Sequence, residues 1–430
     1  MDKYSLEGNV SVLDRVAMEE SRRPFFRVYY NDVYEVPLPP RHRFPMKKYG
    51  QVRRQVQQWI AELPQEEQDL VNCGRFFYFG KRFTVQNFQL VPPLCMYMNS
   101  HAAFETTFDN IDFHISPLAS VEELTTTHSP EYIQRFLDGE QTEQEQRNVG
   151  FPWSQEGVKR ALSSVGGTLA AACDACEEWR GRMDSDAGDR QDKNRLATFA
   201  PWAAHVAGGT HHSFYDRGEG FSVFSDIAVA ANVVLDRYSD IIKRILIVVS
   251  LVHSLRQLFR ISLTSLMVLL PLKQDLDVHQ GNGNAVLFQN CNEVVTFSMH
   301  CEANFFSEKQ QSDLDIELPE GCSDQTYLAT LNHWLKVIEK EAGSTFDMIF
   351  FQAGVDVLEE DRLGRMSLSL KGVTRRNELV YDFAHKLNIP LVICMGGGYP
   401  RTDDWTSIID AHANVYFQAH RFLAKKSQPT

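Results

Sequence analysis

The sequence contains no long uncharged apolar run, although 43% of its 430 residues are hydrophobic. Residues 1 to 20 carry charges throughout, and we therefore expect no secretory signal peptide. The most apolar stretch, residues 241 to 272, is interrupted by His253, Arg256 and Arg260, whereas a transmembrane helix needs about 20 consecutive apolar residues. We expect an intracellular protein without a membrane anchor, resident in the nucleus, the cytoplasm or both.

The sequence also lacks a block rich in lysine and arginine, and its formal net charge is -13. Phosphate backbones are bound mainly through such basic groups, so this composition argues against direct binding of nucleic acid. A negative surface suits a basic, lysine-bearing partner. The same charge is equally well explained by a requirement for solubility.

The 8 cysteines are scattered along the chain without the spacing of a disulfide framework. Only Cys173 and Cys176 form a CxxC motif, in an alanine-rich pattern typical of a helix. No second pair completes a metal site. We interpret both cysteines as structural.

Apolar runs with strand character alternate along the chain with segments of helical periodicity. The length allows one large hydrophobic core. The alternation predicts an α/β domain with a mainly parallel central sheet and helices on both faces. We expect strands at residues 25–38, 244–248, 293–299, 348–351 and 390–394, helices at 47–63, 121–137, 155–179, 222–238, 323–342 and 370–387, and an exposed loop at 180–195.

The most informative segment for chemistry reads DLDVHQGNG, residues 275 to 283. It places Asp277 and His279 two residues apart, just before a glycine-rich turn. Side chains two apart on an extended segment point the same way, so a carboxylate oxygen and an imidazole nitrogen can reach one metal ion. The segment therefore predicts part of a metal site.

Three more polar or glycine-rich segments lie where an α/β sheet presents its functional groups, at predicted strand ends and turns. Adjacent histidines are costly in a core, and His211 and His212 follow a pair of glycines. Asp356 ends the segment QAGVD after an apolar run. Near the C-terminus, GGGY lets the backbone approach a ligand closely and ends at Tyr399.

In this order, the motifs HH, DLDVHQGNG, QAGVD with DRLG, and GGGY resemble those of the zinc-dependent histone deacetylase and acetylpolyamine amidohydrolase superfamily. The resemblance implies an arginase/deacetylase-like fold, with a lead at residues 1–24 and a single domain at residues 25–425. Similarity to class IV-like deacetylases and their bacterial relatives rests on RFPM at 43–46, GFPWS at 150–154, FSMH at 297–300 and SDLD at 312–315.

The resemblance implies that Asp277, His279 and Asp356 bind a zinc ion. Such a set leaves positions open for water and a substrate carbonyl, as a catalytic zinc site requires. A single Asp or His of this kind is more often a hydrogen-bonded loop carboxylate or a core histidine than a metal ligand. The three residues occur together in the order of the family motifs, which favours the interpretation as a metal site. A monovalent cation, K+, is further implied at Asp275, Ser298 and Met299.

The resemblance also implies the groups that move protons during amide hydrolysis. His212 is expected to act as general base and acid, with His211 as its electrostatic partner. Asp275 should accept a hydrogen bond from His211, and Asn282 from His212. Tyr399 is expected to donate toward the developing oxyanion, with a core tyrosine at a strand end as the alternative.

A narrow apolar tunnel for the acyl-lysine chain is implied as well. Phe221 and one of Phe305 or Phe306, with Phe306 preferred, are candidate walls, because aromatic faces can sandwich a methylene chain. Ordinary packing is the alternative for these rings. The remaining residues expected to bind substrate are Gly220, Gly397 and Gly398.

Two segments fall outside the resemblance, at about residues 73–108 and at 249–274. The second separates the strand at 244–248 from the metal-binding segment, and compact domains rarely carry so long an insertion within a core strand. Its Val-Ser start is compatible with a splice donor and its final Gln with a splice acceptor. We hypothesise a retained intron or a gene-model error, with a lineage-specific insertion as the alternative; cDNA sequencing would distinguish them.

The resemblance implies hydrolysis of the N-acetyl-lysine amide in histones or other proteins. Acetylated proteins would then be the partners, with a chromatin complex as a further expectation. A small-molecule acetylpolyamine amidohydrolase is the alternative within the same class. A catalytically impaired binding or scaffold protein is the alternative from another class, because residues 249–274 could displace the metal ligands, and ~1 Å can cost about a hundredfold in rate.

Overall fold

One parallel sheet forms the centre of the protein. The computed structural model describes residues 26–40, 42–64, 112–188, 200–248, 274–275, 277–304, 307–342 and 345–426. All strand pairings in this part are parallel, in the order β2-β1-β3-β9-β8-β4-β6-β5 with β7 beside β6. The predicted parallel α/β architecture is therefore confirmed. The strands are β1 Phe26–Tyr30, β2 Asp112–Ile115, β3 Trp202–His205, β4 Ile245–Val248, β5 Gln274–Asp275, β6 Val294–Cys301, β7 Leu314–Leu318, β8 Met348–Gln352 and β9 Leu391–Cys394.

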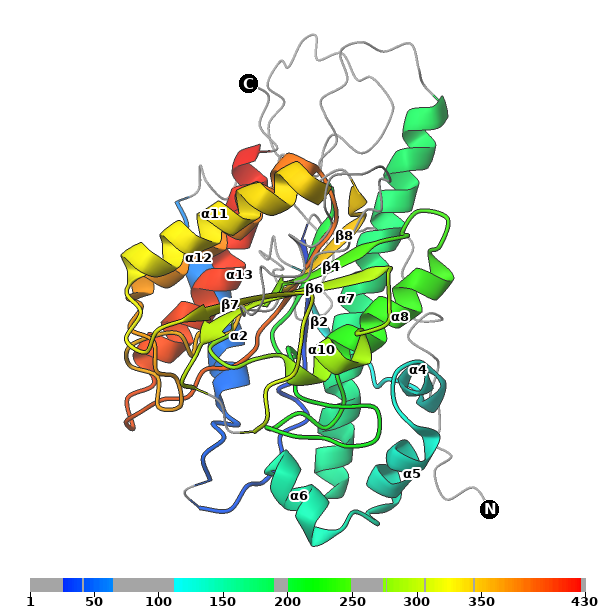
Figure 1. The fold of residues 1–430 in the computed structure, drawn as a ribbon, viewed down its shortest axis with the longest axis vertical. Helices are drawn as coiled ribbons and strands as arrows, with labels where there is room; N and C mark the ends of the chain where they lie inside the picture. Colours follow the sequence, from blue (N-terminus) through cyan, green and yellow to red (C-terminus); the bar gives the residue numbers. More distant parts are fainter. Residues whose placement is uncertain are drawn as a thin grey trace, which may run out of the picture.

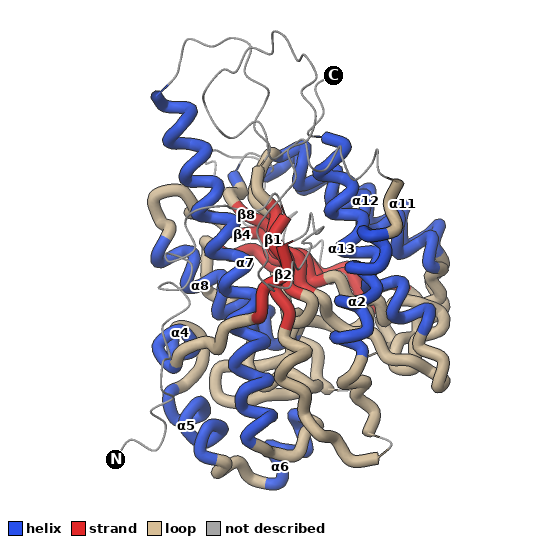
Figure 2. The backbone as a smooth tube through the Cα atoms, turned by 180° about the vertical axis from the view of Figure 1, so that it is seen from behind, coloured by secondary structure: helices blue, strands red, loops and turns tan. Residues whose placement is uncertain are grey.

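Helices cover both faces of this sheet, as Figures 1 and 2 show. The first face carries α2 (Lys48–Ala61), α11 (Asp324–Ala342), α12 (Leu370–Leu387) and α13 (Thr406–Lys426), and the second carries α7 (Gln155–Gly188) and α8 (Asp226–Arg237). None of the helices in the described part combines the length and hydropathy needed to cross a bilayer. The shorter helices are α4 Val121–Thr125, α5 Pro130–Asp138, α6 Glu143–Val149 and α10 Asn282–Leu287.

Successive residues of the central strands enter two separate hydrophobic cores. In β8, Ile349 packs in the core beneath α2, α11, α12 and α13, whereas Phe350 packs in the core beneath α7 and α8. In β1, Val28 and Tyr29 divide in the same way. A strand buried on both faces needs apolar residues at consecutive positions, which explains the unbroken apolar runs in the sequence.

Several predicted boundaries were wrong. The strand expected at 25–38 ends at Tyr30, and the helix expected at 222–238 begins at Asp226 after its cap residue Ser225. The helix expected at 121–137 is divided into α4 and α5, because Ser129 caps a new helix and Pro130 occupies its first turn. The loop expected at 180–195 is helical as far as Gly188, the end of α7. Arg180 and Arg182 form ion pairs with Glu177 and Glu178 along that helix, which supports the extension.

The short strand β5 continues the line of β4 along β6. Val248 lies opposite Phe297, and Asp275 lies opposite Ser298, the next residue of β6. If Val248 were joined directly to Asp275, the two residues would form one continuous strand paired with β6 in this same register. Residues 249–273, most of the predicted insertion, lie outside the described residues, as do residues 1–24 and 73–108. The retained-intron hypothesis stays a prediction.

Candidate active site

Four loops meet at the carboxyl edge of the sheet. The loop after β3 carries His211 and His212, and the segment after β5 carries Asp277 and His279. The loops after β8 and β9 carry Asp356 and Tyr399. Because β3, β9, β8 and β4–β5 lie side by side in one parallel sheet, these groups converge at the place where α/β proteins bind ligands.

Asp277, His279 and Asp356 form the one metal-binding cluster found in the described part of the chain, and their potential ligand atoms lie within 4.8 Å of one another. His279 Nδ1 is 3.3 Å from Asp277 Oδ1 and 3.3 Å from Asp356 Oδ2. All three residues are buried. The Val278 amide donates to Asp356 Oδ1 at 3.0 Å, so that Asp356 Oδ2 is the oxygen turned toward His279. The O, N, O donor set fits zinc.

The charges of this cluster are strongly perturbed. Burial, together with the charge of Asp277, raises the pKa of Asp356 to about 6. Burial opposes protonation of His279, but hydrogen bonds to both carboxylates outweigh it and raise its pKa to about 10. Two carboxylates packed this closely need a compensating positive charge, which protonated His279 supplies and which a bound cation would supply in place of that proton.

The two histidines stand at one side of this cluster, with ring centroids 4.0 Å apart. Asn282 Oδ1 accepts from the Gly283 amide at 3.0 Å and lies 2.8 Å from His212 Nδ1, so His212 Nδ1 is the donor of that contact. Burial and the neighbouring His211 hold the pKa of His212 well below its usual range. The neutral ring therefore presents Nε2 as the nitrogen that can take up a proton.

The side chain of Asp275, the other expected partner of this pair, lies outside the described part of the chain. His211 Nε2 lies 3.9 Å from Asp277 Oδ1. In the expected potassium site, Ser298 Oγ is buried and makes no hydrogen bond to a described residue, and Met299 is fully buried. That site stays a prediction.

Tyr399 lies at the floor of the cleft, 9% exposed. Burial, with the negative charges of Asp356 and Asp277, raises the pKa of its hydroxyl well above the usual value. The hydroxyl therefore stays protonated and can donate a hydrogen bond. The backbone amide of Tyr399 donates to Asp361 Oδ2 at 2.6 Å, which fixes this end of the glycine-rich loop.

The cleft above these groups has a volume of about 850 Å³, and Phe221 forms part of its wall. Phe221 has a φ of 64°, an unusual value for a residue with a side chain, and its amide donates to Val149 O at 2.8 Å. Its ring contacts Phe44 and Phe151, with centroids 5.1 and 5.3 Å away; both lie in motifs quoted above, but neither was predicted as a wall of the tunnel. Phe305 and Phe306 lie outside the described residues.

Of the glycines expected to bind substrate, Gly220 lines the cleft but Gly397 and Gly398 do not. The Gly397 amide donates to Asp277 Oδ2 at 2.9 Å. A Cβ at Gly397 would lie 2.0 Å from Asp356 Oδ2, so only glycine fits there. In this structure these two glycines hold the metal-site loop together.

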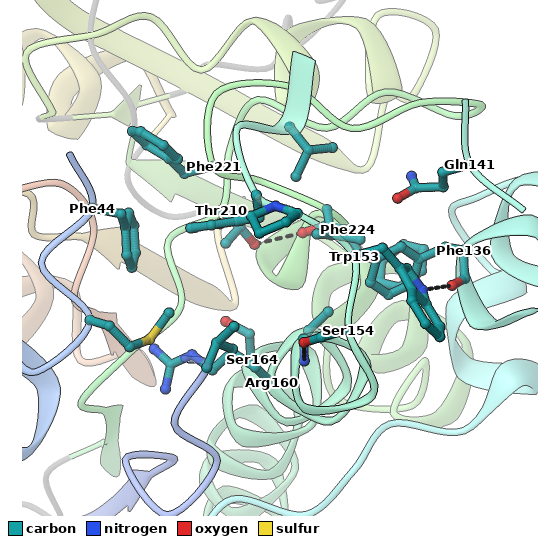
Figure 3. Close-up of a pocket in the computed structure, with 18 of the residues that line it drawn as sticks. Phe44, Phe136, Gln141, Trp153, Ser154, Arg160, Ser164, Thr210, Phe221 and Phe224 are labelled. Atoms are coloured by element: carbon teal, nitrogen blue, oxygen red, sulfur yellow. Dashed lines mark hydrogen bonds between the residues drawn. The ribbon is translucent and has the colours of Figure 1, made fainter. Parts of the chain in front are cut away.

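A smaller internal cavity of about 70 Å³ lies on the other side of Phe221 (Figure 3). Its wall is mostly apolar, with Trp153 and Phe224 at one end and Phe44 at the other. The guanidinium of Arg160 also lines it and lies 3.9 Å from the ring centroid of Tyr49. No motif in the sequence indicated this cavity.

Buried polar side chains that sequence reasoning missed fix three of the site loops. Gln352 Nε2 donates to Asp277 Oδ2 at 2.9 Å. Asp226 accepts from the amides of Gly209 and Thr210, just before the histidine pair. Arg376, fully buried on α12, donates to the carbonyls of Ala353 and Gly354. Gln352 belongs to the motif that ends at Asp356, but nothing in the sequence around these three residues indicates which loop each one holds.

Lys48 anchors the fourth loop, the one that carries Tyr399. Its side chain is 1% exposed, and its Nζ donates to Gly398 O at 3.0 Å and lies 5.2 Å from the ring centroid of Tyr399. Burial lowers the pKa of Lys48 to about 8, while the charges of Asp356 and Asp361 oppose this shift. The lysine thus places a donor directly beneath the catalytic loop.

Comparison with known proteins agrees with this geometry. The model of the histone deacetylase domain matches residues 96–254 and 272–415, and the gap lies within the predicted insertion. An uncharacterised protein of Picosynechococcus sp. is 36% identical over 278 residues, 65% of this chain and 75% of that protein. Histone deacetylase 2 of Arabidopsis thaliana is 29% identical over 211 residues, 48% of this chain and 47% of that protein.

Human histone deacetylase 1 is 26% identical over 303 residues, 65% of this chain and 51% of that protein. The chain therefore spans about half the length of the Arabidopsis and human deacetylases. The crystal structure of a histone deacetylase homologue complexed with SAHA superposes with a TM-score of 0.55. It covers 95% of this chain and 86% of its own at 18% identity, which supports the fold alone. Because the family model matches most of the chain, the protein belongs to the histone deacetylase family of hydrolases.

Proposed function

We propose that the protein is a zinc-dependent lysine deacetylase, which hydrolyses the amide of N-acetyl-lysine in proteins. The observation that carries this proposal is the convergence of the Asp277, His279 and Asp356 cluster with His212 and Tyr399 at one cleft. A metal site, a neutral imidazole and a protonated phenol at one place are the groups that amide hydrolysis requires.

A bound zinc ion, held by these three side chains, would polarise the substrate carbonyl and lower the pKa of a water molecule. His212 Nε2 takes the proton of the attacking water and passes it to the leaving lysine amine. Asn282 keeps His212 in the required tautomer through its 2.8 Å contact with Nδ1. The Tyr399 hydroxyl donates to the oxygen on which negative charge develops.

The test is reconstitution of the purified protein. The chelated protein is loaded with increasing zinc, and turnover is measured on an acetyl-lysine peptide and on acetylspermidine. We expect one zinc ion per chain and turnover of the peptide that rises with zinc content. Asp356→Asn should bind less zinc and lose turnover. Zinc-loaded protein that leaves the peptide intact, or turns over only acetylspermidine, would contradict the proposal.

A further inference from the structure

The mouth of the cleft carries a charge opposite to that of the whole chain. Although the chain has a formal net charge of -13, four arginines line the cleft and no described aspartate or glutamate does. All four are exposed at the surface. They come from three separate segments: Arg43 before α2, Arg147 on α6, and Arg362 and Arg365 after β8.

These arginines are largely unneutralised. Arg147 pairs with Glu143 at 3.1 Å and Arg365 with Glu320 at 3.9 Å, and both pairs are solvent-exposed. Exposed pairs of this kind are weak and leave the cation accessible to another anion. Arg43 and Arg362 form no ion pair with any described carboxylate.

A carboxylate that adjoins the cleft is already engaged. Glu219 precedes the wall residue Gly220 and accepts a hydrogen bond from Asn282 at 3.3 Å. The charged side chains that line the cleft in the described part are therefore the four arginines, which attract an anionic ligand toward the entrance.

We propose that this arginine rim selects acyl-lysine side chains that lie in acidic peptide segments. The inference rests on the proposed function and names its substrate class. Arginine binds carboxylates through paired hydrogen bonds and keeps its charge at all physiological pH values. Polycationic acetylpolyamines and strongly basic peptide segments are disfavoured at the same rim.

The position of the arginines assigns them to the residues that flank the lysine. An acyl group in the site lies beside Tyr399 and the metal ligands, which are buried, whereas the rim arginines are exposed. An extended peptide advances about 3.3 Å per residue, so residues within three or four of the lysine can reach the rim. A carboxylate at the end of a longer acyl group would instead enter the buried floor.

The test measures peptide binding and turnover separately on the zinc-loaded protein. Three acetyl-lysine peptides of equal length carry aspartate and glutamate, serine and glutamine, or lysine and arginine beside the modified residue. A fourth peptide with neutral flanks carries succinyl-lysine. Dissociation constants are measured by competition at 50 and 300 mM NaCl, and turnover is measured in parallel. The variants are Arg43→Gln/Arg362→Gln and a control of equal charge change, Arg54→Gln/Arg375→Gln.

We expect the acidic peptide to bind about 10-fold more tightly than the basic peptide at low salt, and the difference to narrow at high salt. Arg43→Gln/Arg362→Gln should remove most of this preference and leave binding of the neutral peptide unchanged. The control should keep the preference. Turnover should follow binding through KM, with kcat unchanged.

Equal binding of the three acetylated peptides, or a preference that both double variants remove equally, would overturn the inference. So would a preference for succinyl-lysine that depends on Arg43 and Arg362, because it would assign them to the acyl group. An acidic preference in binding without turnover of any peptide would support the rim assignment and contradict the proposed deacetylase activity.

Discussion

The floor of the cleft and its rim are built in opposite ways. On the floor every functional group is buried and its loop is held by a second polar residue, such as Gln352 at Asp277 or Lys48 at the loop of Tyr399. On the rim the arginines are exposed, and Arg43 and Arg362 lack an ion pair within the described part. Buried groups on hydrogen-bonded loops stay in place, which suits catalysis that tolerates little displacement. Exposed charges are better suited to selecting which substrate binds.

The largest effect should come from removing one atom of the floor. Tyr399→Phe removes the hydroxyl donor, and we expect kcat to fall about 100- to 1000-fold because the developing oxyanion loses its hydrogen bond. Zinc content and peptide binding should be unchanged. Kinetics with metal analysis would measure this, and Tyr215→Phe, at an exposed tyrosine, is the control. Full turnover of Tyr399→Phe would remove the tyrosine from the mechanism.

A methyl group added at Gly397 should displace the metal ligands. Gly397→Ala would place its Cβ 2.0 Å from Asp356 Oδ2, so the metal ligands must shift. We expect weaker zinc binding and a loss of about 100-fold in activity, since displacements near 1 Å cost that much. Gly181→Ala on α7 meets nothing within 4 Å and is the matched control. Normal zinc affinity in Gly397→Ala would contradict the close approach.

Lys48, which holds the loop of Tyr399, should affect stability and kcat without contacting the substrate. Lys48→Met leaves the Gly398 carbonyl without its donor, which costs about 1–3 kcal/mol of stability. We expect kcat to fall by about 10-fold or more while KM for the peptide changes little. Lys47→Met, at the exposed neighbouring lysine, should have no effect. Denaturation and kinetics together would test this, and a change in KM alone would place Lys48 with substrate binding instead.

The packing behind the histidine loop should respond to pH, whereas the rim should not. His128 accepts from the Ser225 amide through Nε2, and burial lowers its pKa to about 4. Between pH 6.5 and 4 the unfolded chain therefore binds more protons at this histidine, and stability falls as pH falls, by up to about 1.4 kcal/mol per pH unit. The rim arginines keep their charge over this range. Urea denaturation from pH 7 to 5, with His128→Asn as reference, would measure the difference.

Deletion of the 26-residue segment should have the smallest effect on zinc binding, stability and turnover. Deletion of residues 249–274 joins Val248 to Asp275 in the register that β4 and β5 already share along β6. We expect unchanged or higher zinc content, stability and turnover. Thermal denaturation and zinc analysis of both forms would show this. Loss of folding in the shortened protein would contradict the retained-intron hypothesis and favour a genuine insertion.

The sequence predicted those parts of the site that lie in one motif each. Asp277 and His279 were recognisable from their spacing two residues apart before a glycine-rich turn, and Asp356 from its place after an apolar run. Lys48 and Arg376 could not be predicted, since each lies on a helix outside the motif of the loop it holds, and only the folded chain brings the two together. The rim escaped prediction for the same reason, because its arginines gather only when three distant segments fold together.

The junction of β4 and β5 bears on how the metal site assembles. Only two residues, Gln274 and Asp275, dock β5 onto the sheet, yet the segment that follows carries two of the three metal ligands. When the chain folds, bringing Val248 and Gln274 together across a segment of this length costs about 3 kcal/mol of chain entropy. So short a strand offsets little of this by itself. Binding of the proposed zinc ion would therefore be coupled to completion of the strand, because the ligands on the segment after β5 can meet Asp356 only when β5 is docked.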